Sequence, residues 1–140
     1  MGGMIAFGEK LAALFTPGSH GSTFAGNPLG AAAGLATLDV IEDENLVANA
    51  EARGEQLRDG IMATGNPLFV SVRGRGLLDA VELKHPCSHA VMNYCLEHGL
   101  IVNAVAPNAL RFAPPLIVTA QDVDQALAIL KDVPTDLPDD

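Results

Sequence analysis

The sequence predicts an α/β fold built around a small sheet. Helix-like and strand-like segments alternate along the 140 residues in the order β-α-loop-α-α-β-β-α-β-β-α. Hydrophobic residues make up 49% of the chain and charged residues 18%, a balance that fills a core. No internal repeat or low-complexity block interrupts this order, so each element is identified from its own pattern.

The overall charge narrows the classes of partner. Eight Lys and Arg residues against 17 Asp and Glu give a formal net charge of -9. Such a chain repels phosphate backbones and anionic lipid, so we expect neither a nucleic-acid nor a membrane partner. The richest apolar stretch, residues 29–41, is too short to span a bilayer. Two cysteines do not form a disulfide framework, and we expect a soluble, cytoplasmic protein.

The N-terminal segments begin with residues 4–7, which have the pattern of the end of a buried strand. A short helix is predicted over residues 9–15, and residues 16–22 form a loop dense in turn-favouring residue types. The strand begins almost at Met1 and no later strand obviously pairs with it. We therefore expect the chain to begin in the middle of a larger fold.

Two helices are predicted next. Asn27 is a favourable N-cap, and Pro28 stands at the first helical position, where its missing N–H costs nothing. This helix extends to about residue 42, and its many small side chains predict burial on several sides. The second helix covers residues 45–63 and is amphipathic. Its predicted inner face consists of Leu46, Ala50, Gly54, Leu57 and Ile61.

The second half is predicted to hold strands over residues 68–72, 77–83, 100–105 and 110–112 and a helix over residues 89–98. Arg73 and Arg75, separated by glycines, are interpreted as turn residues between the first two of these strands. Thr119 caps the last helix, with Asp122 in a capping-box position. The predicted inner face of that helix consists of Val123, Ala126, Leu127 and Leu130. The tail after residue 132 is expected to be loose.

The loop at residues 18–28 is the first candidate site. The hydroxyl groups of Ser19, Ser22 and Thr23, together with the helix N-terminus at Asn27, are able to hold an anion. The loop lacks the lysine of a nucleotide-binding P-loop. On spacing alone, a turn followed by an N-cap is the favoured interpretation.

Arg111 is the second candidate. It stands between Leu110 and Phe112, and apolar neighbours on both sides imply a partly dry environment. A guanidinium group grips a carboxylate through two parallel hydrogen bonds, so the position suits carboxylate binding. A solvated arginine on the outer side of a strand is the alternative.

Metal and nucleophile chemistry find little support. The third candidate is a group of five residues of metal-ligand types: His85, Cys87, His89, Cys95 and His98. Pro86 breaks the helical spacing of the first pair, and no four-ligand zinc pattern is present, so we expect surface histidines, buried thiols and no metal. None of the lysines, Lys10, Lys84 and Lys131, has a context that favours Schiff-base chemistry.

Four segments resemble the class III pyridoxal-phosphate aminotransferases. Residues 21–29 (GSTFAGNPL) are close to that family's loop, with Ala25 in place of the commoner glycine. The other three are residues 38–42 (LDVIE), similar to the interdomain helix, 72–78 (VRGRGLL), similar to the small-domain hairpin, and 110–117 (LRFAPPLI), similar to the last strand. The resemblance implies the C-terminal part of a fold-type I pyridoxal-phosphate-dependent transferase, the end of the large domain plus the small α/β domain.

The resemblance also implies a domain organisation and a branch of the family. Residues 1–43 correspond to the end of the large cofactor-binding domain and the interdomain helix, residues 44–132 to the small α/β domain, and residues 133–140 to an acidic tail. Residues 99–103 (GLIVN) resemble the acetylornithine branch.

Three residues carry over from the family's sites. Thr23 matches the hydroxyl that binds the phosphate of pyridoxal 5'-phosphate in the neighbouring subunit of a homodimer. Ser22 matches a residue beside the substrate. Arg111 matches the arginine that holds the α-carboxylate of the amino-acid or 2-oxo-acid substrate. The family's Schiff-base lysine lies before the position matched by Met1, so the resemblance implies no catalytic residue in this chain.

The implied activity is transfer of the amino group of N-acetylornithine to 2-oxoglutarate in arginine biosynthesis. Without the Schiff-base lysine, the chain alone is expected to be inactive. Alternative aminotransferases of the class act on ornithine, succinylornithine or 4-aminobutyrate. Two non-enzymatic alternatives stay open as well, namely a carboxylate-binding module and an inert truncation product.

Overall fold

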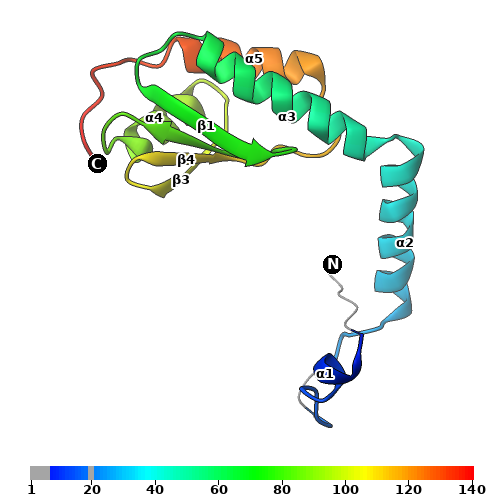
Figure 1. Ribbon diagram of the computed structural model, residues 1–140. Coiled ribbons are helices and arrows are strands. Elements are labelled where there is room, and N and C mark those ends of the chain that lie inside the picture. The colour runs from blue at the N-terminus through cyan, green and yellow to red at the C-terminus, as the bar shows by residue number, and fades with distance from the viewer. Residues whose placement is uncertain (1–6, 19–20) are drawn as a thin grey trace. The chain divides into compact units, whose positions relative to one another are not determined.

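The computed structural model describes residues 7–18 and 21–140, and these divide into two compact units (Figure 1). The first unit is Met1–Glu44 and the second is Asn45–Asp140. The strand predicted at residues 4–7 lies outside the described residues except for Phe7, which is exposed and belongs to no strand.

The first unit contains α1 (Glu9–Ala12) and α2 (Pro28–Asp43). Asn27 is the N-cap of α2, as predicted, because its Oδ1 accepts a hydrogen bond from the Gly30 N–H at 2.7 Å. The predicted burial of α2 on several sides is wrong for this chain, since Gly30 is its only buried residue. Small side chains permit close packing, but no other described element of this unit covers the helix.

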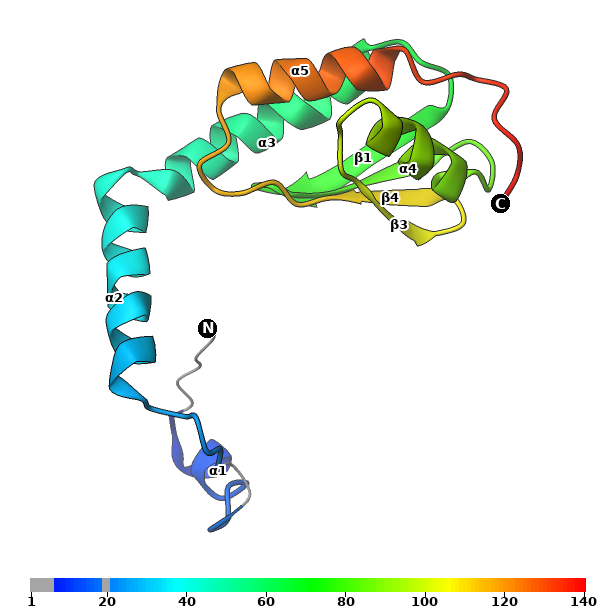
Figure 2. The same ribbon diagram turned by 180° about the vertical axis from the view of Figure 1, so that it is seen from behind.

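The second unit is a four-stranded antiparallel sheet in the order β1-β2-β4-β3. Its strands are β1 (Phe69–Arg75), β2 (Leu78–Leu83), β3 (Asn103–Ala106) and β4 (Ala109–Phe112). Its helices are α3 (Leu46–Ala63), α4 (Ser88–Glu97) and α5 (Ala120–Lys131). All three helices lie on one face of the sheet, as Figures 1 and 2 show from opposite sides. The other face of the sheet carries no helix of this unit.

Two strand boundaries differ from the prediction. Arg73 and Arg75 are not turn residues, because β1 continues through both of them and pairs with β2 up to the Arg75–Leu78 pair. The predicted strand at residues 100–105 starts only at residue 103. Gly99 has a φ of 86°, and the Leu100 N–H returns to the Cys95 carbonyl at 2.8 Å, so this residue closes the end of α4 and does not extend β3.

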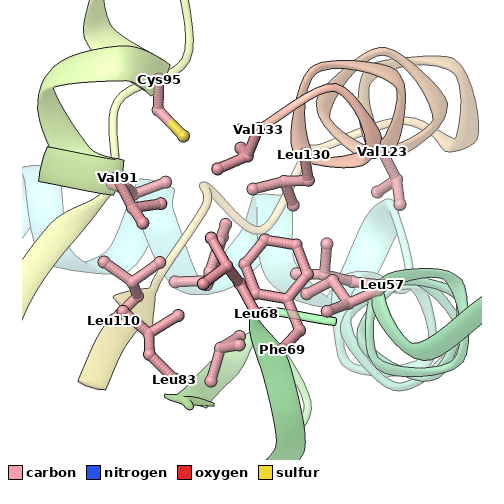
Figure 3. Packing of buried hydrophobic residues seen from close by; sticks show 14 of the residues in the cluster. Leu57, Leu68, Phe69, Leu83, Val91, Cys95, Leu110, Val123, Leu130 and Val133 are labelled. Carbon is pink, nitrogen blue, oxygen red and sulfur yellow. The ribbon is translucent and has the colours of Figure 1, made fainter. Parts of the chain in front are cut away.

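The hydrophobic core lies between the helices and the inner face of the sheet (Figure 3). Leu57 and Ile61 of α3 are buried there, as the amphipathic pattern predicts. The inner face of α5 is likewise confirmed, with Val123 and Leu130 buried. Thr119 forms the predicted capping box with Asp122 at the start of that helix. The hydrophobic core therefore belongs to the second unit.

The C-terminal tail is not loose. Val133 is buried, and the Asp140 carboxylate accepts hydrogen bonds from the N–H groups of His89 and Ala90 and from the hydroxyl of Ser88. Desolvation raises the pKa of Asp140, but these hydrogen bonds outweigh it and lower the pKa to about 2. The N-cap of α4 makes no side-chain hydrogen bond, so a distant carboxylate satisfies donors that the local sequence leaves open.

A buried ion pair fastens the β1–β2 hairpin to α3. Arg58 Nη1 donates to Asp79 Oδ1 at 2.9 Å and to the Gly76 carbonyl at 3.0 Å. The Asp79 side chain is fully buried; desolvation raises its pKa, and the hydrogen bond and charge of Arg58 act against that rise. Gly54 permits the close approach, because a Cβ there would collide with the Gly76 carbonyl.

We predict that Arg58→Ala destabilises the chain by about 3–5 kcal/mol at pH 7, because it leaves a buried carboxylate without its partner. Burial then acts alone and raises the pKa of Asp79 further. A carboxyl with a raised folded pKa lowers stability as the pH rises through that pKa, so the loss should be smaller at pH 4 than at pH 7. Denaturant titrations at both pH values measure this difference.

Arg53→Ala is the matched control, since Arg53 lies on the same helix and donates to the uncharged side chain of Gln56. It should cost less than about 1 kcal/mol at either pH. Equal losses for the two variants, or a loss for Arg58→Ala that does not change with pH, would contradict the assigned role of the pair.

Candidate functional site

The register of the sheet brings four residues into one row across all four strands. Arg73 pairs with Ala80, and both Ala80 and Asn103 pair with Arg111. Directly paired residues project from the same face of a sheet, so this row shares one face. The row alternates with the buried residues Val81 and Leu110. It therefore lies on the face that the helices do not cover.

Arg111 is the residue of this row that the sequence predicts as a carboxylate-binding site. Leu110 and Phe112 are buried beneath it, whereas Arg111 itself is exposed. This matches the alternative of a solvated arginine on the outer side of a strand. The partly dry environment expected from its apolar neighbours is not observed, because strand alternation turns those two side chains to the opposite face. Arg111 Nη2 donates to Asn103 Oδ1 at 3.2 Å. An amide oxygen does not neutralise the guanidinium, which stays available to an anion.

A pocket of about 380 Å³ opens beside Arg111 and Asn103. Its remaining wall is mainly apolar and comes from the end of β4, the segment before β3 and the helices, including Phe112, Pro114, Ile101 and Val123. A charged donor at the rim of an apolar pocket is a common arrangement for a small carboxylic acid. The pocket wall also includes Asp122, whose carboxylate bonds to Thr119, and the role of Arg111 in carboxylate binding stays a prediction.

Ser22 and Thr23 lie together in the loop before α2, in the other unit. Both residues are exposed, and within residues 7–18 and 21–140 neither hydroxyl group has a hydrogen-bond partner. The Ser22 carbonyl accepts from the Ala25 N–H at 3.1 Å, which closes a turn between these residues and Asn27. Ser19, the third hydroxyl of the predicted anion site, lies outside the described residues. The loop offers two free hydroxyl groups close to a helix N-terminus.

The two thiols are buried. Desolvation raises the pKa of Cys95 to about 11. Burial also raises the pKa of Cys87, and the charges of Asp140 and Asp139 add to this rise. Both effects favour the protonated thiol over the nucleophilic thiolate.

The three histidines among the described residues have partners within the chain. His85 pairs with Asp139 at 2.7 Å and His89 with Asp140 at 3.0 Å, while the ring of His98 stacks on Tyr94. In the described part of the chain no cluster of three or more His, Cys, Asp or Glu side chains could hold a metal ion. Lys10, Lys84 and Lys131 are all exposed. No helix among the described residues is long and apolar enough to cross a membrane.

Two residues of the row were not found from the sequence as site residues. Asn103 becomes the partner of Arg111 only through the β3–β4 register. The sequence pattern places the start of β3 three residues too early, so it does not give this register. Arg73 joins the row only because β1 continues beyond residue 72, where the predicted strand ends. A two-residue turn fixes the register of a hairpin. Counting outward from each such turn, and following the alternation of polar and apolar residues, could have predicted the strand partners of both residues.

Comparison with known proteins gives a consistent result. The Aminotransferase class-III family matches residues 3–133. The acetylornithine aminotransferase of Gloeobacter violaceus is 43% identical over 145 residues, covering 99% of this chain and 36% of its own length. The ornithine aminotransferase of Staphylococcus carnosus is 43% identical over 132 residues, covering 92% of this chain and 32% of its own.

The solved structure of the acetylornithine aminotransferase from Elizabethkingia anophelis has a TM-score of 0.74 at 38% identity. The match covers 86% of this chain and 33% of that one. The expected α/β fold of this family is therefore confirmed. The chain spans about a third of the length of the curated relatives it matches.

Proposed function

The chain belongs to the class-III aminotransferases, and from this premise we propose that it forms the C-terminal part of a pyridoxal-phosphate-dependent transaminase. The observation that carries the proposal is the exposed Arg111 beside a largely apolar pocket, with no carboxylate partner in the described part of the chain. The division proposed for the enzyme gives residues 1–43 to the large domain, 44–132 to the small domain and 133–140 to the tail.

The free hydroxyl groups of the loop before α2 fit the phosphate of pyridoxal 5'-phosphate. Phosphate oxygens accept hydrogen bonds from hydroxyl groups and are favoured near a helix N-terminus. We assign Thr23 to the phosphate of the cofactor in the neighbouring subunit of a homodimer and Ser22 to a position beside the substrate. When bound, the cofactor supplies the electron sink that transamination requires.

Arg111 is assigned to the α-carboxylate of the amino-acid or 2-oxo-acid substrate. The planar guanidinium presents parallel donors that match the two carboxylate oxygens. Asn103 holds one side of the guanidinium at 3.2 Å, so it orients the group without neutralising its charge. Substrate binding by this chain is thus an ion pair formed on an exposed strand.

The proposed reaction transfers the terminal amino group of N-acetylornithine to 2-oxoglutarate, in the cytoplasm and as a step of arginine biosynthesis. Support comes from the relatives named acetylornithine aminotransferase. Ornithine is the second candidate donor, because the S. carnosus ornithine aminotransferase has the same 43% identity. The Schiff-base lysine is assigned to a portion of the enzyme outside these 140 residues.

The experiment uses a chimeric enzyme, in which this chain replaces the corresponding third of the G. violaceus acetylornithine aminotransferase. Transamination of acetylornithine, with 2-oxoglutarate as acceptor, tests the function directly. Absence of turnover in a folded, cofactor-loaded chimera would refute it.

We predict that the 140-residue chain alone shows no turnover of acetylornithine and forms no stoichiometric adduct with pyridoxal phosphate. Its lysines are exposed, and no apolar pocket surrounds them to favour a Schiff base. Borohydride trapping followed by mass spectrometry measures the adduct. One lysine labelled in full, together with turnover, would contradict the assignment of the lysine to another portion.

We predict that Thr23→Ala in the chimera weakens retention of the cofactor by about 1.5–3 kcal/mol, because one hydrogen bond to a charged group is lost. Equilibrium dialysis against free cofactor measures the change. Thr37→Ala is the matched control, since the Thr37 hydroxyl donates to the Ala33 carbonyl within α2 at 2.8 Å. Equal retention in both variants would show that the loop at residues 18–28 is only a turn.

We predict that Arg111→Lys raises KM for both acetylornithine and 2-oxoglutarate, because lysine keeps the charge and loses the planar pair of donors. Arg111→Ala should lower kcat/KM by about ten- to a hundred-fold, the worth of a charge-assisted hydrogen bond. Cofactor content should stay normal in both variants. A fall in kcat/KM of less than about three-fold for both substrates would reject the assignment.

A further inference from the structure

The segment that follows Val133 lies beyond the residues that match the aminotransferase family, which end at residue 133. It contains no helix or strand, yet its side chains bind the rest of the second unit. Figures 1 and 2 both show it running from the end of α5 toward α4. Residues 134–140 are called the strap below.

The strap has one firmly fixed end. Val133, the residue before it, is buried in the hydrophobic core, as Figure 3 shows. The Val133 carbonyl accepts a hydrogen bond from Asn66 Nδ2 at 2.8 Å, and Asn66 is itself buried. Opening of the strap therefore hinges after Val133 and leaves the core closed.

Asp140 holds the far end of the strap at the start of α4. Its carboxylate accepts hydrogen bonds from the N–H groups of His89 and Ala90, at 3.0 and 3.3 Å. The same carboxylate accepts from the Ser88 hydroxyl at 3.0 Å, and the Asp140 N–H donates to the Pro86 carbonyl at 2.6 Å. All these partners lie within residues 86–90, so one strap residue closes the start of the helix.

Between these two ends the strap is attached weakly. Leu137 packs against the core but is only partly buried, and Asp139 pairs with His85 through side chains that water reaches. Exposed ion pairs contribute little to stability, and segments with few buried contacts open at low cost in free energy. When the strap opens, water replaces the Asp140 carboxylate at the N–H groups of α4, so no donor is left unsatisfied.

The closed strap lies next to the Cys87 thiol. Cys87 is the N-cap residue of α4, and Asp140 binds the residues on both sides of it, Pro86 and Ser88. Cys87 is fully buried. Burial raises the pKa of its thiol, and the charges of Asp140 and Asp139 add to this rise. Both of these charges belong to the strap.

Without the strap, the same position favours the opposite state of the thiol. The free N–H groups and the dipole at a helix N-terminus stabilise a thiolate. The charged or titratable side chains within three residues of Cys87 are those of Lys84, His85 and His89, and cations also favour a thiolate. The turn at residues 106–109, which accepts a hydrogen bond from the Ser88 N–H, carries no charged side chain. The unfavourable charges around this thiol therefore come from the strap.

We propose that the strap is a switch over the start of α4: when closed it keeps the Cys87 thiol protonated and away from solvent, and when open it releases this thiol as a nucleophile at a helix N-terminus. The latch is the Asp140 carboxylate. This inference is independent of the proposed transaminase function, because every contact that it uses lies within the second unit.

The experiment measures the rate at which iodoacetamide alkylates each cysteine of the 140-residue chain, by mass spectrometry of the peptides. We expect Asp140→Ala to raise the rate at Cys87 by at least about ten-fold, because loss of one hydrogen bond to a charged group shifts an opening equilibrium by at least that factor. The rate at Cys95 should change by less than about two-fold. Cys95 lies in the core with Val133, which opening of the strap leaves in place.

Asp136→Ala is the matched control, because Asp136 belongs to the strap, is exposed and makes no hydrogen bond or ion pair with the described residues. It should leave both alkylation rates unchanged. Asp140→Glu keeps the carboxylate and should preserve part of the protection of Cys87. The dependence of the rate on pH gives a second readout. Its midpoint for Cys87 should fall in Asp140→Ala, since the variant removes a negative charge and admits water to the thiol.

An unchanged rate at Cys87 in Asp140→Ala would overturn the switch. Equal increases at both cysteines would overturn it too, because they would show unfolding of the whole second unit and not opening of a strap. An unchanged midpoint would have the same consequence, since the open state would then not favour the thiolate.

Discussion

The helices cover only one face of the sheet, and this decides which strand residues are buried and which remain accessible to a ligand. The three helices of the second unit bury one face, so alternate residues of β2 and β4 are committed to the core. Leu110 and Phe112 are buried for this reason, and Arg111 between them has to project from the other face. The same alternation on β1 gives that face Arg73. The position of both cations is thus a consequence of core packing.

The buried pair between Arg58 and Asp79 keeps the strands in this arrangement. Asp79 pairs in register with Phe112 on β4, and its carboxylate is bound to α3 on the helical face. A shift of one residue along β2 would place this carboxylate on the uncovered face and Ala80 in the core. Such a shift would leave Arg58 without its partner, so the ion pair adds register specificity to the hydrophobic pattern.

Sequence patterns correctly predicted the elements that depend on contacts between residues close in sequence. The caps at Asn27 and Thr119 and the inner face of α3 follow from residues within a few positions, and the structure confirms them. The end of β1, the start of β3 and the anchored tail depend on contacts with distant segments, as Asp140 at the start of α4 illustrates. Within the site, Arg111 was identified from the sequence as a guanidinium group between apolar residues. Arg73 and Asn103 were found only once the pairing register of the strands was known. The roles of Ser22 and Thr23 stay predictions.

The net charge of -9 opposes the approach of anions from a distance. Charges on a surface are screened beyond about 8 Å at physiological ionic strength, so distant carboxylates act weakly on a small ligand. A long polyanion differs, because its charges extend over much of the acidic surface and each adds to the repulsion. A compact anion on the uncovered face lies close to Arg73 and Arg111, and the Glu82 carboxylate lies beside Arg73 on the same face. The charges next to Arg111, which strand register places there, therefore act on a small anion more strongly than the overall charge of the chain does.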